Sequence, residues 1–426
     1  MAKAGSSREK GVYRKTTLKN GLRVITEKIH SVRSISIGVW IDIGSRNERL
    51  NENGLSHFIE HMIFKGTRRR TARQIAASLE SIGGALNGFT SREQTCYTAR
   101  ILDEHLNQAI DILADITCNS TITAANVNRE RQVICEEIKE SLDNPSDHIH
   151  DLFSLTFWGK HPLGQPIMGS QENIMSVTRA QLKSFQKRHY RGGSVVIAAS
   201  GSISHDKLVR LVRNKFTFPL GSAEPSEQAW RSKDRVIAVV QSDNSQTQFC
   251  LGFPGYAFDT KEKMPILALN SYLGGGMSSV LFQKIREERG LAYAVYSYHE
   301  FYRDSGIFGV YLGTDKAHLG KAFDLILQEL TRVKKRRLAS SVLDKVKAQM
   351  KGHLTLSMES TTNRMSRLAR QELMTGKHQS FGQILKEMDT VNSSDILEMA
   401  NSVFDKSKMA IAVLGPADKN VFANVG

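Results

Sequence analysis

The sequence repeats one pattern of strands and helices at an offset of about half its length. Near the start, Asn20-Gly21 lies between two extended runs, which is typical of a β-hairpin, and an alternating strand and helices follow it. The extended segments of the first half are residues 17–27, 34–44 and 194–201, and those of the second are residues 235–241, 247–253 and 409–415. Such internal repetition predicts two similar halves.

Length and composition agree with this interpretation. A chain of 426 residues is too long for one ordinary core, and 40% hydrophobic with 24% charged residues is typical of globular proteins. Residues 216–235 contain two prolines and many small polar residues, as a linker does. We therefore predict domains at residues 1–220 and 221–426. Each should be an α+β half with a mainly antiparallel sheet packed with helices.

Composition also excludes several classes of protein. No run approaches the roughly 18 apolar residues of a membrane helix, and the charged N-terminus lacks the apolar core of a secretory signal. The four cysteines form no CxxC pair, which favours buried thiols in a reducing compartment. The net charge of +15 invites a nucleic-acid partner, but no module combines basic and aromatic residues for that purpose. We expect neither membrane insertion nor nucleic-acid binding.

The most informative motif is His57, Glu60 and His61, in the order H-x-x-E-H among apolar residues at helical spacing. On a helix, residues i and i+4 lie on one face, so both imidazoles can hold one cation, and imidazole is a standard zinc ligand. Glu60 would lie close enough to take a proton from a metal-bound water. This is the inverzincin signature of zinc peptidases. The motif also arises by chance, so a third ligand is needed.

A candidate for the third ligand lies on the helix predicted over residues 124–143. Glu130 and Glu137 are seven residues apart, two turns of a helix, and so share a face. Val133 and Ile134 lie between them, so we expect this face to point inward. A buried carboxylate is costly unless it binds a cation or is paired.

Two other glutamates on this helix, Glu136 and Glu140, compete for the role. Glu136 is rotated by about 100° from Glu137 and would face elsewhere. All four glutamates could also form one solvated stripe, because charge runs usually face water. The residues alone leave the choice open and favour the solvated stripe.

The spacing of these residues resembles that of the pitrilysin and mitochondrial-processing-peptidase family. Glu137 follows His61 by 76 residues, and the similarity covers essentially the whole chain, including its two halves. It is closest to the bacterial processing-peptidase-like branch. The resemblance implies that His57, His61 and Glu137 bind one Zn²⁺ per chain and that Glu60 activates water. It also implies that Glu130 supports the site from outside the ligand set.

A second segment matches the strand on which this family binds substrate. Asn87, Gly88 and Phe89 occupy the matching positions of the extended run at residues 85–90. The resemblance implies that a peptide adds to this strand through main-chain hydrogen bonds. Taken alone, the run equally fits an ordinary hairpin strand.

A third match is the pair Arg286 and Tyr293, seven residues apart in the second half. Family members place such a pair across the cavity from the zinc. The resemblance implies that Tyr293 donates to the developing oxyanion and that Arg286 holds a substrate carbonyl or carboxylate. Without it, Arg286 would be a surface charge and Tyr293 a core aromatic.

Together these features predict a zinc metalloendopeptidase that cleaves short or extended peptides. The first half would be catalytic, and the second half, which has no H-x-x-E-H, would hold substrate. The resemblance implies a homodimer, or a heterodimer with a motif-lacking relative, in the bacterial cytoplasm rather than an organelle matrix. The alternative is a non-catalytic scaffold or processing-complex subunit that binds peptides.

Overall fold

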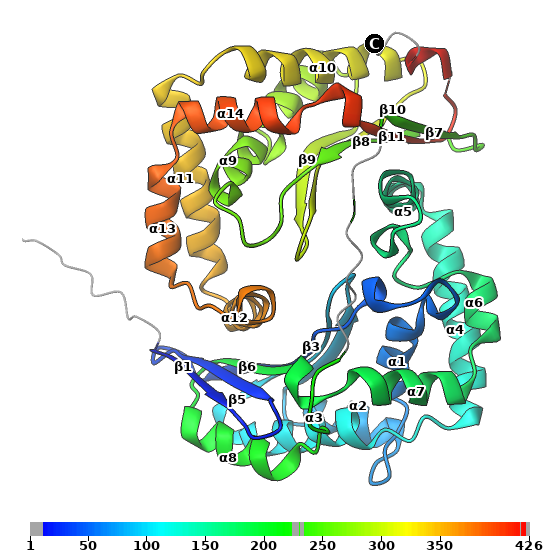
Figure 1. Ribbon diagram of the computed structural model, residues 1–426, viewed down its shortest axis with the longest axis vertical. Helices are drawn as coiled ribbons and strands as arrows, with labels where there is room; N and C mark the ends of the chain where they lie inside the picture. Colours follow the sequence, from blue (N-terminus) through cyan, green and yellow to red (C-terminus); the bar gives the residue numbers. More distant parts are fainter. Residues whose placement is uncertain (1–11, 224–229, 231–233, 418, 423–426) are drawn as a thin grey trace, which may run out of the picture. The chain divides into compact units, whose positions relative to one another are not determined.

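The computed structural model describes residues 12–223, 230, 234–417 and 419–422 (Figure 1). Residues 224–229 and 231–233 of the predicted linker lie outside the described residues. The chain forms two compact units, each built around one sheet. Unit 1 comprises Met1–Glu136, Ile167–Ser226 and Leu356–His378, and unit 2 comprises Glu137–Pro166, Glu227–Thr355 and Gln379–Gly426.

The sheet of unit 1 has six strands in the order β1-β2-β6-β3-β5-β4. Neighbours pair antiparallel except β2 and β6, which are parallel. The strands are β1 (Val12–Thr17), β2 (Arg23–Lys28), β3 (Ser34–Ile41), β4 (Ala85–Thr90), β5 (Thr95–Leu102) and β6 (Val195–Gly201). The outermost strand β4 pairs with β5 in this sheet, and all of β6 is buried.

Among the described residues, the sheet of unit 2 repeats this arrangement without a counterpart of β1. Its order is β7-β11-β8-β10-β9, in which β7 and β11 are parallel, as β2 and β6 are in unit 1, and the other neighbours are antiparallel. The strands are β7 (Val236–Val240), β8 (Thr247–Pro254), β9 (Ala294–Phe301), β10 (Gly306–Thr314) and β11 (Ala410–Leu414). The predicted α+β fold with two homologous halves is confirmed.

Helices cover both sheets. Those associated with unit 1 are α1 (Leu55–Ile63), α2 (Ala72–Glu80), α3 (Leu106–Asn119), α4 (Ala124–Asp143), α6 (Gln171–Ser176), α7 (Arg179–His189), α8 (His205–Lys215) and α12 (Thr361–Thr375). Those of unit 2 are α5 (Pro145–Trp158), α9 (Lys263–Gly274), α10 (Leu319–Lys335), α11 (Ser340–Ser357), α13 (Phe381–Thr390) and α14 (Ser393–Val403), with a π-helical turn, η6 (Phe282–Glu287). The last residues of α4 and α11 extend past the unit boundaries.

Helix α12 belongs to the second half of the sequence but packs on the sheet of the first half (Figure 1). Its buried Met365 and Leu368 join Trp40, Val196 and Ala198 in one apolar cluster. Alternate residues of a strand face opposite sides, so this cluster covers one face of the sheet. Helix α3 contacts β5 and helix α8 contacts β2, and the strands β3 and β6, which lie between β2 and β5 in the sheet, are buried almost throughout.

Ion pairs also hold α12 in place. Glu27 on β2 accepts from Arg364, with the closest atoms 2.7 Å apart, and Glu372 on α12 lies 2.7 Å from Lys15. Both carboxylates are buried. Such pairs fix the register of the helix on the sheet more than they add stability, because desolvation offsets much of the attraction.

Helix α5 makes the converse exchange. It lies in the first half of the sequence and contacts β7, β8 and β11 in unit 2. Phe153 and Trp158 are buried there together with Cys250 and Ala412. The exchange of α5 and α12 joins each half of the chain to the sheet of the other.

The predicted boundary between residues 220 and 221 separates the two sheets, but the compact units are discontinuous because of this exchange. Assignment of a catalytic role to one half and a substrate-holding role to the other stays a prediction. Among the described residues, no helix combines the length and apolarity needed to cross a membrane. None of the four cysteines forms a disulfide.

The contribution of α12 to the first sheet can be measured with Met365→Ala. Met365 is fully buried in the cluster, so we expect the substitution to lower the free energy of unfolding by about 2–5 kcal/mol. Met277→Ala is the matched control, because Met277 is 75% exposed and should change stability little. Denaturant unfolding of both variants tests this, and equal stability would contradict the packing role of α12.

Candidate metal centre

Three predicted ligands lie together on α1 and α4. His57, His61 and Glu137 each offer a ligand atom, and these atoms lie within 4.8 Å of one another. The two imidazole rings are 4.7 Å apart between centroids, as expected one turn apart on one helix face. Two imidazoles and a carboxylate are the donor set of catalytic zinc sites with three protein ligands. The residues present therefore fit Zn²⁺.

The electrostatics of the histidines favour metal binding. Burial lowers the pKa of His57 to about 4, and the neighbouring His61 adds to this effect. Desolvation disfavours the charged imidazolium, so His57 is neutral at neutral pH. A neutral imidazole is the form that coordinates a metal.

Glu130 contacts one of the candidate ligands, His61. Its side chain is only 2% exposed, with Oε2 3.2 Å from His61 Nδ1 and Oε1 2.9 Å from Lys65 Nζ. A carboxylate on Nδ1 fixes the ring orientation and leaves Nε2 as the nitrogen to coordinate. The Lys65 ammonium partly offsets the cost of burying the Glu130 charge.

The structure also distinguishes the four glutamates of α4. Glu130 is buried and Glu137 partly buried, whereas Glu136 and Glu140 are exposed, so the four do not form one solvated stripe. The expectation that Val133 points inward is wrong, because its side chain is 41% exposed while Ile134 is fully buried. The buried face of α4 therefore includes Ile134 but not Val133, and is narrower than the face we predicted.

Glu60 lies on α1 between the two histidines and contacts β4. The hydroxyl of Thr90 donates to Glu60 Oε2 at 2.6 Å. A Cβ built at Gly88 would lie 3.2 Å from Glu60 Cγ, so the strand passes directly against this side chain. No local pattern in the sequence selects Thr90, because its contact with Glu60 depends on how a strand packs against a helix.

The predicted substrate strand is β4 itself, the edge of its sheet. Successive residues of a strand face opposite sides of the sheet, so Asn87 and Phe89 lie on the face opposite to that of Gly88, and both are exposed. Phe89 is 42% exposed and lies edge-on to Trp40, with ring centroids 5.4 Å apart. An edge strand offers main-chain groups to an added peptide strand, as the substrate-binding prediction requires.

The predicted pair Arg286 and Tyr293 lies in unit 2. Arg286 is exposed on η6, with its guanidinium carbon 4.9 Å from the centre of the Phe282 ring. Tyr293 precedes β9, is 54% exposed, and donates from its hydroxyl to Asp315 Oδ2 at 3.1 Å. This hydrogen bond raises the pKa of Tyr293, which keeps the hydroxyl protonated as a donor.

The start of α1 depends on a residue that the sequence did not single out. The buried Glu48 carboxylate accepts from the backbone N–H groups of Ser56 at 2.6 Å and Gly54 at 2.8 Å. These are donors that the first turn of a helix leaves without partners inside the helix. Gly54 itself has φ +99°, and a Cβ there would lie 2.7 Å from Ile174 Cδ1. Only glycine fits this position without strain.

The end of α1 is fixed from the other side. Ser120 Oγ donates to the carbonyl of Met62 at 3.2 Å, and Asn126 Nδ2 donates to the carbonyl of Lys65 at 3.0 Å. Asn126 lies in the first turn of α4, the same helix that carries Glu130 and Glu137. The first turn of α4 is therefore hydrogen-bonded to the segment that directly follows α1.

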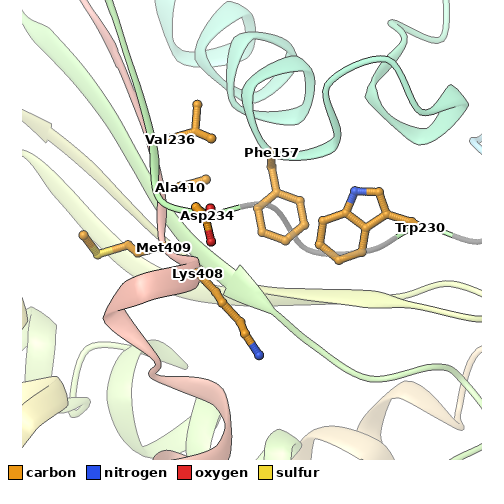
Figure 2. Close-up of a pocket in the computed structure, with 7 residues that line it drawn as sticks. All are labelled: Phe157, Trp230, Asp234, Val236, Lys408, Met409 and Ala410. Carbon is orange, nitrogen blue, oxygen red and sulfur yellow. The ribbon is translucent and has the colours of Figure 1, made fainter.

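A small pocket also occurs in unit 2, and none of the predicted site residues lines it (Figure 2). Figure 2 shows the ring of Phe157 beside that of Trp230, while Val236 and Ala410 belong to strands β7 and β11. The residues lining it are Phe157, Trp230, Asp234, Val236, Lys408, Met409 and Ala410. None of them was predicted to bind metal or substrate.

Comparison with known families identifies the chain. Residues 23–171 match the family described as Insulinase (Peptidase family M16), and residues 176–350 match the Peptidase M16 inactive domain. The chain is 40% identical to the uncharacterized zinc protease YmxG of Bacillus subtilis, over 95% of this chain and 99% of that one. The chain belongs to peptidase family M16. The family predicted from the His57, Glu60, His61 and Glu137 spacing is confirmed.

Further relatives and solved structures agree. An uncharacterized zinc protease of Streptomyces coelicolor is 37% identical over 95% of this M16 chain and 90% of its own length. A crystal structure of a protease from Helicobacter pylori superposes with a TM-score of 0.89 at 23% identity, covering 95% of this chain and all of that one. A Pseudomonas fluorescens structure titled peptidase M16 inactive domain gives 0.88 at 21% identity, over 95% of this chain and 98% of its own. These structures show the shared fold.

The Glu48 cap predicts a pH effect on stability. Burial raises the pKa of Glu48 to about 7 from 4.5, although bonds from Ser56, Gly54 and Asn53 oppose this. The folded state then binds more protons than the unfolded state between these values. The stability from Glu48 is therefore fully present below about pH 4.5 and is lost as the pH rises through about 7. Residue 48 of the E48Q variant cannot titrate. Relative to this variant, the free energy of unfolding of the wild type should fall by on the order of 3 kcal/mol as the pH rises between these two pKa values.

Denaturant unfolding of both proteins from pH 5 to 8, with metal removed, measures this difference. All other groups titrate alike in the two proteins, so their contributions cancel in the difference between the two free energies of unfolding. Glu80→Gln, at an exposed position on α2, controls for the loss of one negative charge. A difference between wild type and E48Q that does not change with pH would contradict the expectation.

Proposed function

We propose that this protein is a zinc-dependent metalloendopeptidase that hydrolyses peptide bonds in short or extended peptides. The observation that carries the proposal is the convergence of His57, His61 and Glu137 within 4.8 Å, with Glu60 on the same helix as both histidines. One Zn²⁺ per chain would be held by these three ligands. A bound zinc would supply Lewis acidity, polarising the scissile carbonyl and lowering the pKa of a bound water.

Glu60 would act as the general base and then as the general acid. Its carboxylate would take a proton from the attacking water and deliver that proton to the nitrogen of the leaving amine, so the carboxylate is regenerated in each cycle. Glu130 would hold the His61 ring in the tautomer that leaves Nε2 for the metal. Its buried carboxylate, 3.2 Å from His61 Nδ1, supports this role.

Substrate would bind by strand addition to β4. Asn87, Gly88 and Phe89 would offer main-chain groups to a peptide in extended conformation, which gives affinity with little dependence on sequence. Arg286 would hold a substrate carbonyl or carboxylate, and Tyr293 would donate to the oxyanion. The Tyr293 hydroxyl bonds to Asp315 here, so this role requires it to exchange that acceptor for the substrate.

Assembly and location complete the proposal. Family resemblance to processing peptidases supports a homodimer, or a heterodimer with a motif-lacking relative. The relatives named above are bacterial, and the cysteines form no disulfide, which supports the bacterial cytoplasm as the location. The alternative of a non-catalytic peptide-binding subunit makes the same assembly prediction but requires no turnover.

Glu60→Gln tests the catalytic role. The substitution removes the base but keeps the ligands, so we expect zinc content to stay near one per chain. Hydrolysis of a quenched fluorescent peptide should fall by at least about 10²–10⁴-fold. A chelator should abolish wild-type activity, and added zinc should restore it. Cleavage by E60Q at the wild-type rate would exclude the mechanism, and a zinc-loaded wild type that binds peptides without cleaving them would favour the scaffold.

Glu130→Gln tests the support for the ligands. Loss of the carboxylate beside His61 should weaken zinc affinity by about 10–100-fold, because it removes the partner that orients the ring. Glu140→Gln is the matched control, since Glu140 is exposed on the same helix. Competition with a fluorescent zinc chelator measures both variants. Equal affinities would show that Glu130 has no role in holding the metal.

A further inference from the structure

We propose that Thr90 is a positioning residue that holds the Glu60 carboxylate in the orientation for proton transfer. The inference rests on the proposed peptidase function. Its first support is the hydrogen bond of 2.6 Å from Thr90 Oγ1 to Glu60 Oε2. This length is typical of a hydroxyl that donates to an ionised carboxylate, which is stronger than a bond between neutral groups.

The strand geometry explains why Thr90 can reach Glu60. Gly88 and Thr90 are two residues apart and face the same side of β4, toward α1. Because Gly88 has no side chain, the strand lies close to the side chains of Glu60 and Phe64. A Cβ atom at position 88 would lie 3.2 Å from Glu60 Cγ and 3.0 Å from Phe64 Cε2. A larger residue at position 88 would press on Glu60 or separate the strand from the helix.

The turn that follows β4 fixes the position of Thr90. Thr90 pairs with Thr95 across the hairpin, and the Ser91 N–H donates to the carbonyl of Gln94 at 2.7 Å. At the tip, Glu93 forms a buried ion pair with Arg46, at 2.7 Å between Glu93 Oε1 and Arg46 Nη1. Arg46 precedes the Glu48 cap by two residues, so one segment holds both the hairpin tip and the start of α1.

The chemical consequence concerns the general base. A carboxylate on a flexible side chain must be ordered before it can accept a proton, and a fixed partner removes that cost from the reaction. Thr90 itself touches neither water nor peptide in this scheme. Because Thr90 belongs to the strand proposed to bind substrate, one element would both hold the peptide and orient the base.

The experiment compares Thr90→Val with Thr90→Ser. Valine has the shape of threonine and its strand preference but lacks the hydroxyl, so we expect kcat to fall by about 10–100-fold with KM within about twofold. Serine keeps the hydroxyl and should stay within about threefold of wild type. Thr98→Val is the matched control, because Thr98 pairs with Asn87 and so faces the other side of the sheet.

Two further measurements separate this inference from the peptidase proposal. Zinc content and unfolding midpoint of each variant establish that metal and fold are retained. Crystal structures of wild type and T90V at one pH show the Glu60 carboxylate directly, and we expect it to be displaced or disordered in T90V. Wild-type kcat in T90V, an equal loss in T90S, or an unmoved Glu60 would overturn the positioning role. Absence of turnover in a wild type with Glu60 held by Thr90 would instead overturn the peptidase proposal.

Discussion

The candidate metal centre depends on a helix of nine residues whose two ends are fixed from outside. Isolated helices shorter than about 12–15 residues are marginal in water, so α1 cannot hold His57 and His61 in place by its own hydrogen bonds. The Glu48 carboxylate satisfies donors at its start, Ser120 satisfies an acceptor at its end, and Asn126 binds the carbonyl of Lys65 just beyond that end. These contacts convert a weak helix into a rigid support for two imidazoles.

The same region collects negative charge. Glu60, Glu130 and Glu137 are all near the two histidines, and burial keeps His57 neutral. Carboxylates so close together repel one another, and each needs a cation or a donor. Lys65 and Thr90 supply partners for Glu130 and Glu60. The ligand atoms of His57, His61 and Glu137 lie within 4.8 Å of one another and form a donor set suited to a divalent cation, which is the physical reason for the zinc proposal.

The duplication has a structural consequence beyond symmetry. The inner strands of each sheet are buried almost throughout, and part of the cover comes from the other half of the chain, α12 on the first sheet and α5 on the second. This exchange requires the halves to fold together, because either sheet alone would expose an apolar face. In α12, Met365 fills the cluster around Trp40, while Arg364 binds Glu27.

The sequence by itself determined the α+β halves and, through its resemblance to a known family, the family and the candidate metal ligands. Hydrophobic alternation predicted β3, and the helical spacing of apolar residues around H-x-x-E-H predicted α1, because these patterns are local. Glu137 and Glu130 were selected by the resemblance to the family, because the residues alone left the choice among the four glutamates of α4 open. Only the tertiary structure decided the exchange of α5 and α12, the outward position of Val133, and the roles of Glu48 and Thr90. Those features depend on contacts between segments distant in the chain, and no local period or propensity encodes such contacts.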